Sequence, residues 1–151
     1  MNKQRYLLDV NVLIALTELK HVHFGIAMKW FGAPGLDWGL CAFSEAGFLR
    51  VAMNPKLGSY SLEEATNVLT SLINRPGYRY WPIEANWTSI TAPFKGRIFG
   101  HQQITDAYLL GLAVKEGGVL VTLDKAIRSM AGPNLSKHVL VLEWTRKRTE
   151  N

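Results

Sequence analysis

The chain has 151 residues, of which 17 are Lys or Arg and 12 are Asp or Glu, with a net charge of +5 and a pI near 9.5. This length predicts a single domain over 1–151 with a core at about 5–142, and a content of 48% hydrophobic and 19% charged residues excludes a disordered chain. The lone Cys41, an expected core thiol, excludes an intramolecular disulfide, and no apolar stretch approaches the roughly 20 residues of a membrane span. We therefore expect a cytoplasmic protein with no membrane association, and the basic balance favours a polyanionic partner.

The N-terminal segment "RYLLDVNVLIAL" predicts a buried strand over 6–8 and then a helix that begins near Asn11. Asp9 and Asn11 interrupt this apolar run, which argues against a secretory signal peptide. A carboxylate between a strand and a helix has two explanations. Asp9 either caps the helix or lies with a cation at the carboxyl end of a parallel strand, where ligands bind in open α/β sheets.

Helices and short apolar strands alternate along the rest of the chain. In chain order the patterns predict a helix over 20–32, a strand over 36–43, helices over 44–53 and 61–75, a strand over 78–83, helices over 86–90 and 104–118, a strand over 119–124, a helix over 125–132 and a strand over 138–142. This alternation predicts a three-layer α/β/α fold with a mainly parallel five-stranded sheet. The residues 145–151 are expected to form a basic tail.

Helix starts are marked by capping residues. Ser44 and Thr105 are the expected N-caps of their helices, and Ser61 with Glu64 forms a capping box. His21 and His23, two positions apart, lie at the start of the predicted helix over 20–32. Because side chains two positions apart do not share a helix face, we expect solvated or capping histidines there.

Four of the 12 acids lie at a strand-to-helix junction or in the first turn of a predicted helix, within apolar sequence: Asp9, Glu45, Asp106 and Asp124. Each alone is explained by helix capping or by the helix dipole. The carboxyl ends of parallel strands meet at one edge of a sheet, so Asp9 and Asp124 are expected to approach each other. Four carboxylates without a cation would raise one another's pKa values, whereas Mg²⁺ or Mn²⁺ would neutralise them. An all-oxygen ligand set favours these ions over Zn²⁺.

Four blocks carry a resemblance to a known family: "LLDVNVLIAL", "SEAGFLRVAMNP", "ITDAYLLGLA" and "VLVTLDKAI". In this order and at these intervals they resemble the PIN-domain ribonucleases, and most closely the VapC-type toxins of bacterial toxin-antitoxin pairs. The resemblance runs from Tyr6 to Leu142, which is nearly the whole chain.

The resemblance implies a metal site and a reaction. The family's metal-binding acids match Asp9, Glu45, Asp106 and Asp124, and its supporting residues match Asn11 and Thr122. The implied reaction is hydrolysis of RNA phosphodiester bonds with Mg²⁺ or Mn²⁺, in which the metal activates water and stabilises charge on the phosphate. Of these acids, Asp9 and Asp106 are the expected direct ligands. The other two either hold a second ion or act through water.

The resemblance also implies partners, namely an RNA substrate, a small antitoxin protein and a second copy of the chain in a homodimer. Phe24, Trp30 and Phe48 are candidate anchors for a partner helix, with burial in the core as their alternative role. Basic residues that are candidates for holding the RNA backbone, or else ordinary surface charges, are Arg50, Lys95, Arg97, Lys125 and Arg128. The polar and basic stretch 84–103 is the expected substrate rim.

Three other functions compete with this one. A phosphatase that forms an aspartyl-phosphate would need a second Asp in place of Asn11. A dinucleotide-binding domain would need a G-x-G-x-x-G turn after the first strand, and the sequence has none there. A PIN-like module that binds RNA or protein without cleaving stays open as the alternative, and loss of an acid would favour it. No acid of the pattern is missing.

Overall fold

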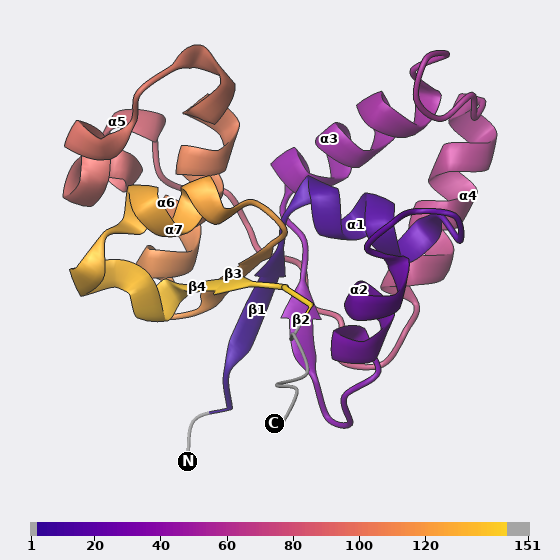
Figure 1. Ribbon diagram of the computed structural model, residues 1–151, viewed down its shortest axis with the longest axis horizontal. Coiled ribbons are helices and arrows are strands. Elements are labelled where there is room, and N and C mark those ends of the chain that lie inside the picture. The colour runs from indigo at the N-terminus through magenta and orange to yellow at the C-terminus, as the bar shows by residue number, and fades with distance from the viewer. Residues whose placement is uncertain (1–2, 145–151) are drawn as a thin grey trace, which may run out of the picture.

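The computed structural model describes residues 3–144, and a parallel sheet of four strands lies at its centre (Figure 1). The strands are β1 (Arg5–Leu8), β2 (Asp37–Gly39), β3 (Val119–Thr122) and β4 (Val139–Val141), in the spatial order β2-β1-β3-β4. Leu7 of β1 pairs with Gly39 on one side and with Leu120 on the other. The carboxyl ends of β1 and β3 therefore lie side by side, at the point where the strand order changes direction.

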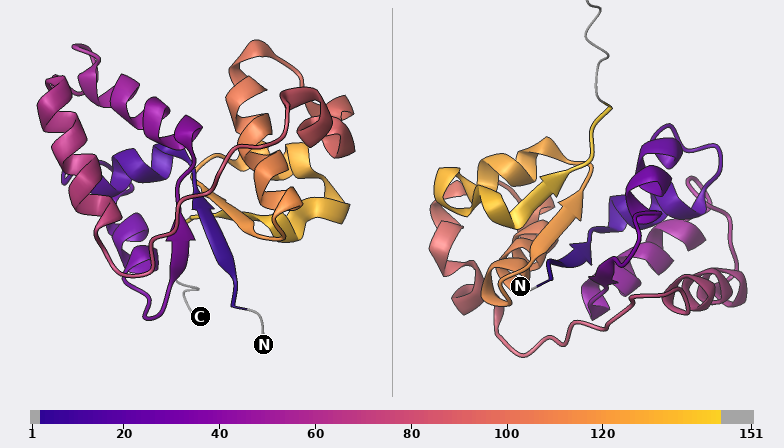
Figure 2. Two further views of the ribbon diagram at one scale, coloured as in Figure 1. Left: turned by 180° about the vertical axis from the view of Figure 1, so that it is seen from behind. Right: turned by 90° about the horizontal axis from the view of Figure 1, so that it is seen from below.

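Helices cover both faces of the sheet (Figures 1 and 2). One layer holds α1 (Val10–Thr17), α2 (Phe24–Phe31), α3 (Ala42–Met53) and α4 (Leu62–Ile73). The other layer holds α5 (Trp87–Thr91), α6 (Ile104–Lys115) and α7 (Lys125–Ala131), with the 3₁₀ turns η1 (Ala92–Arg97), η2 (His101–Gln103) and η3 (Pro133–His138). The predicted three-layer α/β/α class is confirmed.

The core lies in two clusters, one on each face of the sheet. Successive residues of a strand point to opposite faces. Leu8 accordingly packs in a cluster with Trp38 and Phe48, whereas Leu7 packs in a cluster with Trp81. Each such side chain contributes about 2–3 kcal/mol when it is fully buried. Phe48 is only 1% exposed, so its interpretation as a core residue is confirmed and its role as a surface anchor for a partner is wrong.

The predicted strand over 78–83 is absent from the described sheet, so the prediction of five strands is wrong. The segment runs beside β2 and makes a single isolated bridge to it. The backbone N–H groups of Arg79 and Trp81 donate, each at 2.8 Å, to carbonyl groups of β2 and of the residue just after it. In the described residues Trp38 and Tyr78 alone complete a bridge between this segment and β2, so no regular ladder forms, and Pro82 is typical of such an edge segment.

Two predicted helix caps are wrong because their helices begin earlier. Helix α3 already begins at Ala42, so Ser44 is buried inside its first turn. Helix α6 begins at Ile104, so Thr105 also lies within the helix. In both places a capping residue type marks the first turn and not the boundary, which is the usual uncertainty at a helix end.

Other local predictions are confirmed. The side chains of Ser61 and Glu64 each accept the other's backbone N–H at 3.1 Å, which completes the capping box of α4. The Cys41 thiol is buried. Residues 145–151, the predicted basic tail, lie outside the described residues, so the extent of the domain stays a prediction. Between residues 3 and 144, the helices are all too short or too polar to cross a membrane.

The packing of residues 78–83 against β2 predicts that Gly39→Ala is strongly destabilising. A Cβ at Gly39 would overlap the carbonyl oxygen of Arg79 and lie 2.6 Å from the Trp81 ring. We expect the free energy of unfolding to fall by about 3 kcal/mol, measured by urea unfolding followed through tryptophan fluorescence. Gly96→Ala is the control, since a Cβ there meets nothing within 4 Å. Equal stability of the two variants would contradict this packing.

Candidate active site

Asp9 directly follows β1 and is buried, with 3% of its surface exposed. One carboxylate oxygen accepts the backbone N–H of Val10 at 2.7 Å, and the other accepts the hydroxyl of Thr122 at 2.8 Å. Asp9 is therefore the N-cap of α1, which was one of its two explanations. Burial raises the pKa of Asp9, the two hydrogen bonds oppose this effect, and the nearby charge of Asp124 adds to it.

Asn11 and Thr122, the two predicted supporting residues, are brought together by the pairing of β1 and β3. The Thr122 hydroxyl accepts the backbone N–H of Asp124 at 3.0 Å and the side-chain amide of Asn11 at 3.3 Å. The side-chain oxygen of Asn11 accepts the backbone N–H of Leu123 at 3.2 Å. These bonds join the first turn of α1 to the end of β3, where the Thr122 hydroxyl also donates to Asp9.

Asp106 lies in the first turn of α6 and faces the same region from the other helical layer. Its carboxylate is half-buried and makes no hydrogen bond within residues 3–144. Burial raises the pKa of Asp106 to about 7, and the charges of Asp9 and Asp124 add to this shift. Three of the four predicted acids therefore act on one another electrostatically.

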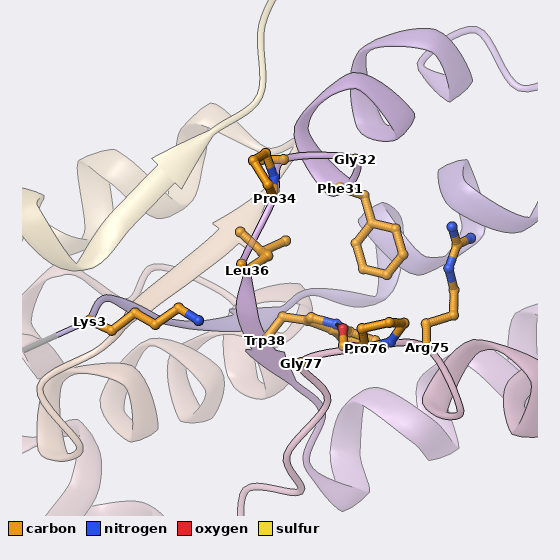
Figure 3. Close-up of a pocket in the computed structure, with 11 residues that line it drawn as sticks. Lys3, Phe31, Gly32, Pro34, Leu36, Trp38, Arg75, Pro76 and Gly77 are labelled. Carbon is orange, nitrogen blue, oxygen red and sulfur yellow. Dashed lines mark hydrogen bonds between the residues drawn. The ribbon is translucent and has the colours of Figure 1, made fainter.

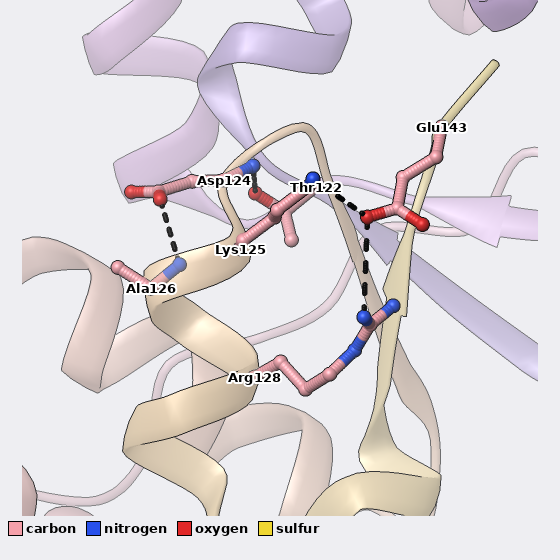
Figure 4. A network of polar contacts seen from close by, with 6 residues as sticks. All are labelled: Thr122, Asp124, Lys125, Ala126, Arg128 and Glu143. Carbon is pink, nitrogen blue, oxygen red and sulfur yellow. Dashed lines mark hydrogen bonds and ion pairs between the residues drawn. The ribbon is translucent and has the colours of Figure 1, made fainter.

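Asp124 is exposed and caps the next helix (Figure 4). One of its carboxylate oxygens accepts the backbone N–H of Ala126 at 2.9 Å, at the start of α7. Lys125 and Arg128, two predicted RNA contacts on this helix, both pair with Glu143, at 3.5 Å and 3.9 Å. Their charges are therefore partly balanced on the surface of the protein.

Glu45 differs from the other three acids. It lies half-buried in the first turn of α3, and burial raises its pKa. Burial raises the pKa of the Tyr78 phenol to about 12, and the charge of Glu45 adds to this shift. Glu45 makes no comparable contribution to the pKa of Asp9 or Asp106. The charges of Asp9, Asp106 and Asp124 therefore influence one another, whereas burial is the cause of the Glu45 shift.

A cleft of about 310 Å³ opens between α1, α3 and α6, and its lining residues are Asp9, Val10, Asn11, Ile14, His21, Val51 and Asp106. Two of the predicted ligands thus share one solvent-accessible space. His21 was expected to be a solvated or capping residue. No pattern in the sequence indicates that it lines this cleft. The loop brings it there through the tertiary fold.

The acids offer a donor set that fits a hard divalent cation. They supply only oxygen atoms, and Asp106 lacks a hydrogen-bond partner among the described residues, so a cation would relieve their repulsion. Nevertheless, no three Asp, Glu, His or Cys side chains converge as a metal-binding group in the part of the chain that the structure describes. The chemistry of these residues therefore fits Mg²⁺ or Mn²⁺, and a four-acid metal centre stays a proposal.

The remaining predicted RNA contacts have different surroundings. Arg97 donates from its guanidinium to the carbonyl groups of Met130 and Ala131, at 2.8 Å and 2.9 Å, so it ties η1 to the end of α7. Arg50 and Lys95 are exposed. The structure thus gives Arg97 a structural role and leaves the other two available to a ligand.

Another cavity, of about 380 Å³, lies at the opposite, amino-terminal ends of β1 and β2 (Figure 3). The Arg75 guanidinium stacks over the Phe31 ring there, 5.1 Å from its centre, and Lys3 lies across the opening. No carboxylate lines this cavity. Asp9 and Asp124 follow the carboxyl ends of β1 and β3, so the cleft beside Asp9 is the candidate active site.

The chain is similar to proteins of one family over most of its length. The sequence profile of the PIN domain matches residues 6–133. Ribonuclease VapC38 of Mycobacterium tuberculosis is 38% identical over 128 residues, which cover 83% of this chain and 89% of the relative. Ribonuclease VapC44 of the same species is 35% identical over 138 residues, which cover 90% and 97%. The fold is also similar to a solved structure, that of VapBC2 from Rickettsia felis bound to a DNA fragment from the VapBC2 promoter. The match has a TM-score of 0.65 and 15% identity, and it covers 93% of this chain and 100% of that chain.

The raised pKa of Asp106 predicts that the metal-free protein loses stability as the pH rises from about 4 to 7. Because its folded-state pKa of about 7 exceeds the ordinary value of 3.8, the folded protein binds more protons than the unfolded chain between these pH values, and the free energy of unfolding falls. Asp106 is partly solvated, so we expect a loss of about 1–2 kcal/mol and not the full value of the shift.

Urea unfolding of chelator-treated protein at several pH values measures this loss. Asp106→Asn should flatten the profile between pH 4 and 7, because an amide does not titrate in this range. Glu63→Gln, on the exposed face of α4, is the matched control and should leave the profile unchanged. A profile that Asp106→Asn leaves as steep as in the wild type would contradict the assignment.

Proposed function

Because the chain belongs to the PIN domain family and, within it, to the VapC type, we propose that it is an endoribonuclease that cleaves RNA phosphodiester bonds with Mg²⁺ or Mn²⁺. The observation that carries this proposal is the cleft that Asp9 and Asp106 share at the switch point of the sheet. Both carboxyl groups have raised pKa values, so a divalent cation would stabilise their charged forms. The ribonuclease names of the relatives support RNA as the substrate.

In this proposal Asp9 and Asp106 hold the ion, and Asp124 and Glu45 act as further carboxylates around it. When bound, Mg²⁺ supplies Lewis-acid activation of the attacking water and offsets charge on the phosphate. Thr122 keeps the Asp9 carboxylate in place through its hydroxyl. Apolar walls from α1 and α3 reduce the solvent around the acids, which strengthens electrostatic interactions there.

We further propose that the protein acts in the cytoplasm as the toxin of a type II toxin-antitoxin pair and that it forms a homodimer. An unrestrained ribonuclease would harm its host, so a partner that covers it is expected. A largely apolar groove of about 380 Å³ runs beside α2 and is lined in part by Ile26, Trp30, Leu142 and Trp144. Trp30 is half-buried, edge-on to Tyr6 at 5.3 Å between ring centres, so it suits the predicted role of an anchor for a partner helix.

One observation favours the alternative of a PIN-like module that binds RNA or protein without cleaving it. Among residues 3–144, the acids do not converge as a ready metal-binding group, and Glu45 acts on Tyr78 instead of on the other acids. A purified protein that binds RNA but leaves it intact with Mg²⁺ and with Mn²⁺ would support this alternative.

Asp9→Asn and Asp106→Asn should each reduce RNA cleavage by about 10²–10³-fold or more, because each removes a charge that the cation needs and keeps the side-chain volume. Glu63→Gln is again the matched control and should cleave at the wild-type rate. Cleavage of a structured RNA pool, followed on denaturing gels, is the measurement. Wild-type rates in either Asp variant would contradict the site.

Cleavage should also require Mg²⁺ or Mn²⁺. Ca²⁺ should bind but support cleavage poorly, because its looser coordination polarises water less, and Zn²⁺ should not be needed. Dialysis of purified protein against EDTA, followed by addition of each metal, tests this requirement. Cleavage that survives excess EDTA would contradict it.

Expression in a bacterial host tests the pairing with an antitoxin. We expect growth arrest when the protein is expressed alone and normal growth when the small reading frame adjacent to its gene is expressed with it. Asp106→Asn is the control and should be harmless in both cases. If the lone protein is harmless although its purified form cleaves RNA, the toxin role is wrong and the ribonuclease proposal stands.

A further inference from the structure

His21 lies in the loop between α1 and α2 and lines the same cleft as the two acids. Its backbone N–H donates to the carbonyl of Glu18 at 3.0 Å, and its own carbonyl accepts the N–H of Phe24 at 3.0 Å. The ring is held as well, because its Nδ1 accepts the backbone N–H of His23 at 3.0 Å. The loop thus fixes this side chain at the rim of the cleft.

The bond to Nδ1 determines which ring nitrogen carries the proton. Only an unprotonated nitrogen can accept an N–H, so the single proton of the His21 ring is on Nε2. Within residues 3–144 this Nε2–H makes no hydrogen bond. A protonated Nε2 has no lone pair for a metal ion, but it can donate to an oxygen atom. His21 therefore presents an N–H donor in the cleft that Asp9 and Asp106 also line.

His21 is one of two lining side chains that keep a donor without a partner among the described residues. The other lining residues are two acids, three apolar residues and Asn11. The Asn11 amide donates one of its two N–H groups to Thr122 and accepts at its oxygen from Leu123, so one N–H of Asn11 is left over. The five predicted basic contacts do not line this cleft. A phosphate that enters the cleft would therefore meet the charge of two acids, which a cation would offset, and His21 and Asn11 would be the side chains able to donate to it.

We propose that the Nε2–H of His21 donates a hydrogen bond to a non-bridging phosphate oxygen of RNA bound in this cleft. The inference rests on the proposed ribonuclease function. If Asp9 and Asp106 held a cation, it would offset the charge of a bound phosphate, and a non-bridging oxygen of that phosphate could still accept from a donor in the cleft. Contacts to phosphate carry no base preference, so His21 contributes affinity for the backbone and not for a sequence.

The substitution His21→Asn removes this donor and is expected to keep the fold of the loop. An Asn side-chain oxygen can accept the N–H of the residue two positions further on, as in an Asx turn, so it can replace the bond made by Nδ1. Its shorter side chain does not carry a donor to the position of Nε2. His23→Ala is the matched control, because it removes the neighbouring ring and keeps the backbone N–H that bonds residue 21.

The probes are a labelled random-sequence RNA of about 12 nucleotides and the DNA of the same length, within the range that single-strand sites cover. Binding is measured by fluorescence anisotropy in Ca²⁺, and the oligonucleotide is checked for integrity on a gel. Mn²⁺ affinity is measured separately, from the rise in melting temperature without nucleic acid. Cleavage of the same RNA by the wild-type protein in Mg²⁺ reports on the proposed function by itself.

We expect His21→Asn to bind both oligonucleotides about 10-fold more weakly, the effect of losing one hydrogen bond to a charged group, with Mn²⁺ affinity unchanged. His23→Ala should bind both like the wild type. Three results for His21→Asn would each overturn the assignment: unchanged binding, a loss of binding confined to RNA, or a loss of Mn²⁺ affinity. A wild-type protein that binds neither oligonucleotide would overturn it as well. A wild type that binds but does not cleave contradicts the ribonuclease function alone.

Discussion

The buried carboxylate of Asp9 is the constraint on which the rest of the site depends. An uncompensated buried charge costs several kcal/mol, which is comparable to the whole net stability of a domain of this size. The compensation here comes from the first N–H of α1 and from the hydroxyl at the end of β3. That hydroxyl is in reach only because β1 and β3 pair in register, with Leu8 beside Val121. The pairing of the central strands and the burial of this charge therefore stabilise each other.

This compensation stops at Asp9 and does not extend to Asp106. The N-terminus of a helix favours a negative charge, yet burial and the two neighbouring acids still raise the pKa of Asp106 to about 7. Helix α6 is buried from Ala107 to Ala113, so packing on all sides prevents it from turning Asp106 towards solvent. A purely structural acid at such a position would have a partner. An unpartnered acid whose pKa two other acids raise is a candidate ligand for a cation, in agreement with the proposed metal site.

General rules of topology predicted the fold class and the approach of Asp9 to Asp124, because both follow from helices that alternate with parallel strands. The sheet content was harder to predict. The segment over 78–83 has the apolar residues of a strand, and Trp81 is indeed fully buried. It pairs with β2 through a single bridge, and the pattern of apolar residues cannot show whether a few hydrogen bonds or a complete ladder will form. The place of His21 beside the acids was not predictable either, since it depends on how a loop folds back over a cleft.

Roles of individual acids were the least predictable part, because one local pattern serves several of them. Glu64, Glu45 and Asp106 all lie in the first turn of a helix. The exposed Glu64 bonds to Ser61 and its pKa is lowered, whereas burial raises the pKa of the other two. Of these two, Asp106 has a pKa that the charges of Asp9 and Asp124 also raise, while the charge of Glu45 acts on the Tyr78 phenol. A first-turn acid thus becomes a cap or a candidate ligand according to what the tertiary fold places in front of it.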